Sequence, residues 1–88
     1  MKGMILKMKE NIIQLNDLNL QEEGIIQKIE CENNIKRRLL DLGMIKGTTI
    51  KLTLISPFKD PKAYEVRGST IALRSEDTKK IYVIPKNN

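Results

Sequence analysis

Histidine and tryptophan are absent from the 88-residue sequence, and cysteine occurs once. Histidine is the commonest general base near neutral pH, so its absence excludes Ser–His and Cys–His nucleophiles. The acidic pairs Glu22-Glu23 and Glu76-Asp77 lack the apolar setting that would separate their two carboxyl pKa values. The five glycines are isolated and form no phosphate-binding loop. We therefore expect no catalytic residue and no enzyme activity.

The single cysteine also limits metal and redox chemistry. Transition-metal sites require Cys, His or clustered carboxylates at fixed spacing, which this sequence does not provide. Cys31 lies between Glu30 and Glu32, whose charges disfavour the thiolate, so we expect a structural role for it. A weak site for a hard cation at those two carboxylates is the remaining alternative. No cofactor and no tight metal site are predicted.

Long apolar runs are missing as well. No stretch approaches the ~20 apolar residues that a membrane span needs. The opening of the chain has a three-residue apolar run, Met4–Leu6, whereas a signal peptide needs about 7–15 apolar residues. A lone cysteine fits a reducing compartment. We expect a cytoplasmic protein.

Aromatic residues are few, although the net charge is +5. Such a charge suggests binding to nucleic acid or to a membrane surface. The basic residues, however, are spread along the chain in short runs, such as those at Arg37-Arg38 and Lys79-Lys80. The three aromatic side chains do not alternate with them to form a stacking platform. A solvated basic surface is favoured, and a nucleic-acid-binding barrel remains the alternative.

One convincing helix is predicted, over residues 34–42. Asn33-Asn34 offers an N-cap, and Gly43 stands at the position where a left-handed residue ends a helix. Apolar residues at positions i, i+4 and i+7 form the stripe expected to face the core: Ile35, Leu39 and Leu42.

Five short strands complete the pattern, over residues 24–29, 48–55, 63–67, 70–74 and 81–84. In the second, alternation predicts that Ile50, Leu52 and Leu54 face the core. The third and fourth form a hairpin across Gly68-Ser69, with Tyr64 and Val66 facing Ile71 and Leu73. Ser75 is expected to cap a single helical turn.

Together these elements predict a mostly-β fold, a small closed barrel of about five strands with one short helix. Closure would remove the exposed edges of so small a sheet. The domain is expected to span residues 13–86, with residues 1–12 as an N-terminal extension.

The segment from Arg38 to Ile50 has an arginine-leucine, leucine-glycine, glycine pattern that resembles the FeoA family of bacterial ferrous iron uptake. The resemblance extends from about Leu15 to Val83 and rests on the order and spacing of the short matching motifs. The further matching positions are Pro57, Asp60-Pro61, Tyr64, Val66, Gly68, Ile71, Ala72-Leu73-Arg74, Ile81 and Val83. The sequence departs from the pattern at Lys46, Phe58-Lys59 and Thr78. The change at Phe58-Lys59 concerns the local conformation of the loop between Pro57 and Pro61 and leaves the expected fold unchanged.

The resemblance implies an SH3-like barrel and a cytoplasmic accessory protein that binds the ferrous iron permease, a membrane protein with a cytoplasmic GTPase domain. It implies an indirect effect on transport, since the sequence has no residues suited to hold iron. Similar domains follow the DNA-binding region of iron- and manganese-dependent repressors, but this sequence has no such region. An oligomerisation module is a further alternative.

Four residues are candidates for partner contact: Met44, Phe58, Arg38 and Arg74. Met44 follows the end of the helix, where we expect an exposed, adaptable thioether. Phe58 lies at a loop tip between prolines and requires cover from the chain's own extension, a second copy or the permease. Arg38 and Arg74 suit an interface, although salt bridges to Asp41 or Glu76 are the favoured alternative.

Overall fold

The computed structural model describes residues 11–86, so most of the predicted N-terminal extension lies outside the described residues. Short apolar segments between turns give strands, and the 3.6-residue apolar period after Cys31 gives the main helix. The elements, in chain order, are β1 (Ile13–Gln14), the 3-10 helix η1 (Leu15–Asp17), β2 (Glu23–Ile29), α2 (Asn33–Asp41), β3 (Thr49–Ile55), β4 (Lys62–Val66), β5 (Ser69–Leu73), α3 (Ser75–Thr78) and β6 (Ile81–Pro85).

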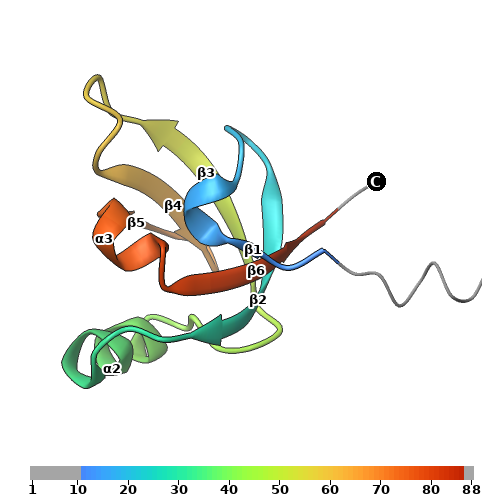
Figure 1. Ribbon diagram of the computed structural model, residues 1–88, viewed down its shortest axis with the longest axis vertical. Coiled ribbons are helices and arrows are strands. Elements are labelled where there is room, and N and C mark those ends of the chain that lie inside the picture. The colour runs from blue at the N-terminus through green and yellow to red at the C-terminus, as the bar shows by residue number, and fades with distance from the viewer. Residues whose placement is uncertain (1–10, 87–88) are drawn as a thin grey trace, which may run out of the picture.

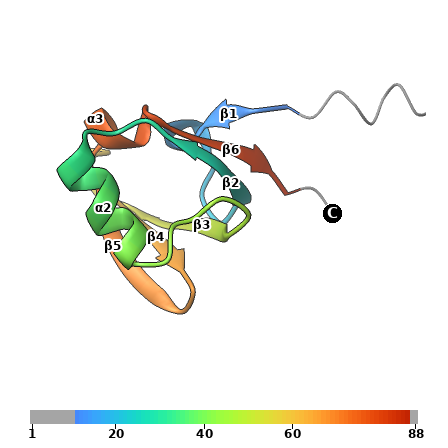
Figure 2. The ribbon, with the colours of Figure 1, turned by 90° about the horizontal axis from the view of Figure 1, so that it is seen from below.

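The strands form one antiparallel sheet in the order β1-β6-β2-β3-β4-β5, which curls around a common interior (Figures 1 and 2). The predicted mostly-β, barrel-like fold with one main helix is confirmed, with β1 as an additional strand. Within residues 11–86, however, the edge strands β1 and β5 do not pair with each other. The expected closure of the barrel by strand pairing is therefore wrong.

Side chains of η1 and α3 join the two edges instead. The hydroxyl of Thr78 in α3 donates a hydrogen bond to Oδ1 of Asn16 in η1 at 3.0 Å. The ammonium of Lys62 in β4 donates to the Asn16 carbonyl oxygen at 3.1 Å. We call this set of contacts the polar seam. It links the beginning of the chain to its last third across the opening that the sheet leaves.

The start of α3 is capped from outside the helix. Ser75, predicted as the cap, is the first helical residue, and the Arg74 side chain at the cap position makes no capping hydrogen bond. The Asp60 carboxylate accepts from the Ser75 amide at 2.9 Å and from the Ser75 hydroxyl at 3.3 Å. Because a loop residue supplies the cap, the sequence around Ser75 could not reveal it.

Fourteen buried apolar residues from strands, helices and connecting segments form a single core. They are Leu15, Leu18, Ile26, Ile29, Cys31, Leu39, Met44, Ile50, Leu52, Tyr64, Val66, Leu73, Ile81 and Val83. Every strand from β2 to β6 contributes, so burial of apolar surface holds the curled sheet together.

The end of α2 places Met44 in the core, which corrects the expectation that it lies at the surface. The Gly43 amide donates to the Leu40 carbonyl at 3.0 Å, and the Met44 amide donates to the Leu39 carbonyl at 3.0 Å. These two bonds form a Schellman motif, in which the residue after the left-handed position packs on the last helical turn. Met44 and Leu39 are both fully buried, whereas Leu42 of the predicted stripe is 39% exposed.

A β-bulge in β3 redirects Leu54, which was also expected in the core. Leu52 pairs with Tyr64, but Leu54 pairs with Ala63, so Thr53 is the extra residue. The Thr53 hydroxyl donates to the Ala63 carbonyl at 3.2 Å. An inserted residue reverses the inward and outward alternation beyond it. Leu54 consequently faces outward.

The β4–β5 hairpin turns at Arg67-Gly68, one residue earlier than predicted, and both residues have positive φ, at 51° and 83°. Such a two-residue turn matches the twist of the flanking strands. Tyr64 pairs with Ile71, and the predicted inward-facing set of the hairpin is confirmed.

The hairpin turn packs against the end of α2 at Gly43. This residue has a φ of 95°, and a Cβ built on it would lie 2.4 Å from Cδ of Arg67. Gly47 has a similar φ of 93° but open space around it. Among the glycines of residues 11–86, Gly43 combines a positive φ with a side chain that an added Cβ would displace.

We predict that Gly43→Ala lowers the free energy of unfolding by more than Gly47→Ala. A left-handed alanine costs about 1–2 kcal/mol at either site, and Gly43→Ala adds displacement of the Arg67 side chain. Denaturant unfolding of both variants measures the difference, and adding Arg67→Ala to each isolates the contact. Equal losses for the two glycine variants would show that Arg67 does not restrict this site.

Candidate functional site

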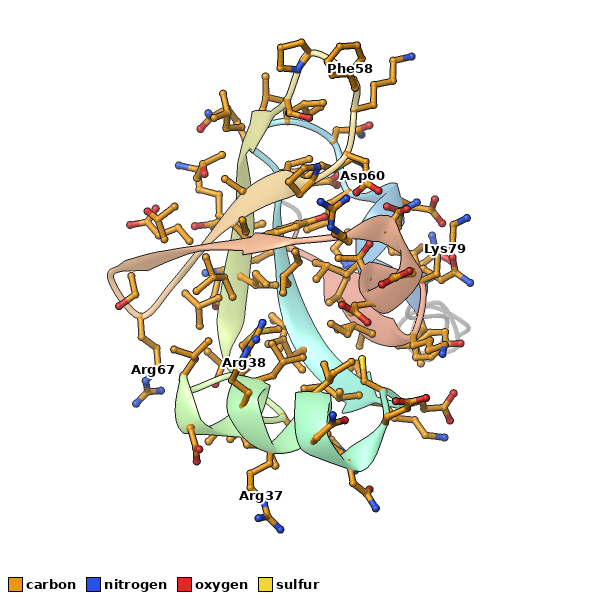
Figure 3. All side chains as sticks on the ribbon, turned by 90° about the vertical axis from the view of Figure 1, so that its left-hand side faces the viewer. Arg37, Arg38, Phe58, Asp60, Arg67 and Lys79 are labelled. Atoms are coloured by element: carbon orange, nitrogen blue, oxygen red, sulfur yellow. The ribbon has the colours of Figure 1, made fainter. Side chains whose placement is uncertain are left out.

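An uncovered apolar surface lies at the end of the molecule formed by the β3–β4 loop. We call it the apolar tip, and its members, with exposed fractions, are Leu20 (52%), Leu54 (62%), Ile55 (38%) and Phe58 (90%). Figure 3 shows Phe58 at the extremity of this loop. No described residue covers its ring, so self-packing within residues 11–86 does not account for it.

Backbone geometry brings these residues to one place. The bulge at Thr53 turns Leu54 outward, while Ile55 pairs with Lys62 at the end of the sheet beyond the core. The Gln21 amide donates to the Leu52 carbonyl at 2.7 Å, which holds Leu20 beside β3. The sequence identified Phe58 but missed the other three, because alternation placed Leu54 inside and nothing indicated the bulge.

Lysines border the apolar tip. A hollow of about 560 Å³ between η1, the β3–β4 loop and α3 has Leu20 and Ile55 in its lining, together with Lys59, Lys62 and Lys79. Asp17 also lines it. Apolar and cationic groups therefore meet at this end of the molecule.

Basic residues gather at the opposite end, around α2 and the β4–β5 turn. Figure 3 shows Arg37, Arg38 and Arg67 there, far from Phe58. We call this region the basic end and define it as residues 36–46 with Arg67. Its charged members are Lys36, Arg37, Arg38, Asp41, Lys46 and Arg67. Lys36, Arg37, Arg38 and Lys46 are already near one another in the sequence, and the fold adds Arg67 to them.

The four predicted contact residues do not form one patch. Phe58 is at the apolar tip, Met44 is buried, and Arg38 is exposed on α2 at the opposite end. Arg74 is exposed at the start of α3.

The salt bridges favoured for Arg38 and Arg74 do not form. Within residues 11–86 the ion pairs are Lys28–Glu30 at 2.7 Å and Lys86–Glu23 at 3.8 Å. Neither arginine is therefore engaged by a described carboxylate.

Cys31 is the chain's only thiol, and it is buried. Its Sγ donates to the Asp77 carbonyl oxygen at 3.6 Å. Burial, followed by the charge of Asp77, raises the pKa of the Cys31 thiol. The carboxylate that disfavours the thiolate is thus Asp77, distant in sequence, and not the adjacent Glu30 or Glu32.

Acidic and sulfur groups do not converge elsewhere in the described chain. Among residues 11–86, no three side chains of His, Cys, Asp or Glu are placed to hold a metal ion. The same residues contain no helix with the length and apolar character of a membrane span. The apolar tip and the basic end are therefore considered as candidate contact surfaces.

Tyr64 is fully buried behind the polar seam, and its hydroxyl has no hydrogen-bond partner of regular geometry among residues 11–86. Burial raises the pKa of Tyr64 to about 12; the nearby Thr78 hydroxyl opposes the shift and the Asp60 charge adds to it. A buried phenol with this pKa is neutral at physiological pH, so it contributes packing and no acid–base chemistry.

Comparison with known proteins identifies related sequences. The FeoA domain family model matches residues 13–85. A protein of Porphyromonas gingivalis, described as an Fe(2+) transport protein A/Fe(2+) transporter FeoB fusion protein, is 30% identical over 71 residues. The match covers 81% of this chain and 8% of that protein. The chain therefore corresponds to a small part of that relative.

Solved structures share the fold. An FeoA-like protein of Clostridium acetobutylicum matches with a TM-score of 0.77 and 28% identity, over 88% of this chain and 90% of that one. The FeoA protein of Chlorobium tepidum matches with a TM-score of 0.82 and 24% identity, over 85% and 71%. A manganese-dependent transcriptional repressor has the same fold at 15% identity, with a TM-score of 0.77 over 89% of this chain and 44% of that one.

We predict that Tyr64 makes stability fall at high pH. Its folded pKa of about 12 exceeds the ordinary value of 10, so its contribution is complete below pH 10 and is lost as pH rises toward 12. The loss should reach about 2–3 kcal/mol. Tyr64→Phe should remove this part of the decline and raise stability at pH 7 by about 1 kcal/mol, because it deletes an unpaired buried hydroxyl.

Denaturant unfolding of the wild type and of Tyr64→Phe between pH 7 and 12 measures the effect. Tyr82→Phe is the control for loss of a phenol, since Tyr82 is only partly buried. Parallel stability profiles for wild type and Tyr64→Phe would contradict the assignment.

Proposed function

This chain belongs to the FeoA domain family, and from that premise we propose that it is a non-catalytic, cytoplasmic accessory protein of ferrous iron uptake. In this proposal it binds the ferrous iron permease and modulates the GTPase or transport cycle. Iron is the cargo of the permease and is not held by this chain. A bound protein shifts its partner's cycle when it binds two states of that partner with different affinity.

The fusion relative supports the choice of partner. In Porphyromonas gingivalis one polypeptide combines a transport protein A unit with the transporter FeoB. A covalent link gives two units a high effective concentration for each other. The fusion therefore supports an association between the two kinds of unit.

The apolar tip is the surface best suited to this contact, and it is the observation that supports the proposal most directly. Phe58 is 90% exposed although it is a large aromatic side chain. Aromatic residues are enriched among those that contribute most to protein interfaces. Lys59, Lys62 and Lys79 beside the tip favour a partner surface with an apolar pocket and nearby carboxylates.

We predict that Phe58→Ala weakens binding to the permease about 30-fold or more, as expected when an interface loses a central aromatic anchor. The melting temperature should stay nearly unchanged, because the ring contacts little of the folded chain. Calorimetric titration of the full-length permease in nanodiscs with each variant measures the affinity.

Ile12→Ala is the matched control, since Ile12 is 57% exposed but lies beside β1, away from the tip. It should bind as the wild type does. Equal affinity for wild type and Phe58→Ala would remove the tip from the interface. A wild-type chain that does not bind the permease at all would refute the proposed function itself.

A further inference from the structure

Positive charge is concentrated at the basic end. Residues 11–86 contain 13 basic and 10 acidic side chains. The basic end holds five of the basic and one of the acidic side chains, so the rest of the described chain holds eight basic and nine acidic side chains. The basic end thus carries a net charge of +4 and the remainder −1. Its charge exceeds the net charge of all the described residues together.

Exposed aliphatic side chains are interleaved with these cations. They are Leu40 (41% exposed), Leu42 (39%) and Ile45 (49%). Leu40 is on α2 between Arg37 and the end of the helix, and it shares a shallow groove with Lys36 and Lys46. The surface is therefore both cationic and apolar.

From this combination we infer that the basic end docks on an anionic membrane surface, with its cations at lipid phosphates and its aliphatic side chains at the boundary of the acyl region. Clustered basic side chains next to exposed apolar ones are an arrangement by which peripheral proteins bind such surfaces. Aliphatic side chains gain nothing from a nucleic-acid backbone, which favours lipid over nucleic acid as the polyanion. No ion pair within residues 11–86 involves the five cations.

The place of this surface in the fold agrees with the inference. The basic end and the apolar tip lie at opposite ends of the molecule (Figure 3). One molecule can therefore hold lipid headgroups at one end while the other end remains free for protein. The inference does not rest on the proposed function, and vesicles without any permease test it.

The experiment is co-sedimentation of the full chain with two kinds of vesicle. One kind is phosphatidylcholine alone, and the other contains roughly 30 mol% phosphatidylglycerol, an anionic lipid that gives the vesicle a negative surface. Binding is expected only to the anionic vesicles and should weaken with salt. Each charge removed at the basic end should weaken binding about fivefold. The double variant Arg37→Gln/Lys46→Gln should therefore bind about 25-fold more weakly.

Lys79→Gln/Lys80→Gln is the matched control. It removes the same charge from exposed positions directly after α3, and it should bind almost as tightly as the wild type. An equal loss in both double variants would mean that net charge alone drives binding, and would overturn the assignment of a site. The assignment would also be overturned if replacing Lys2, Lys7 and Lys9 by Gln weakened vesicle binding while Arg37→Gln/Lys46→Gln did not.

Leu40→Ser/Ile45→Ser keeps every charge and separates lipid from nucleic acid. It should weaken vesicle binding severalfold, because its side chains no longer reach the acyl boundary. A different outcome would identify nucleic acid as the ligand of this surface. In that case the wild type would bind a 20-base-pair duplex tightly but would not bind vesicles, and Leu40→Ser/Ile45→Ser would leave duplex binding unchanged. Absence of vesicle binding by the wild type would refute the inference outright.

Discussion

The structure depends on closing an open sheet. Six short strands curl around one core, but the two edge strands do not pair. In so small a domain, open edges would expose both backbone groups and core side chains. The polar seam joins those edges through Asn16, Lys62 and Thr78. Asp60 adds the external cap of α3 and so fixes the loop next to the seam.

This closure leaves two ends with different chemistry. The core occupies the middle of the sheet, so apolar residues beyond it remain uncovered at the β3–β4 loop. At the other end, the Schellman motif buries Met44 and leaves Leu42 and Ile45 at the surface among cations. Both surfaces result from local backbone features, the β-bulge at Thr53 and the end of α2 at Gly43.

Several errors of sequence interpretation share one cause. Alternation placed Leu54 in the core and helical spacing placed Leu42 there, because each rule assumes that its period continues. A bulge and a helix stop interrupt those periods by a single residue. The Met44 error was avoidable, since Leu-Gly-Met after a helix is the pattern of a Schellman motif with its buried contact. The bulge at Thr53 left no comparable signal.

The sequence by itself determined the mostly-β fold, the helix near residues 34–42 and the hairpin at Gly68, because local propensities and apolar periods specify these. Only the tertiary structure decided what lies far apart in sequence and close in space. It placed Asp60 on Ser75, Asn16 on Thr78, and Arg67 on Gly43 near the cations of residues 36–46. The physical reason is that such pairings depend on how the sheet curls, and curvature results from all the strands together.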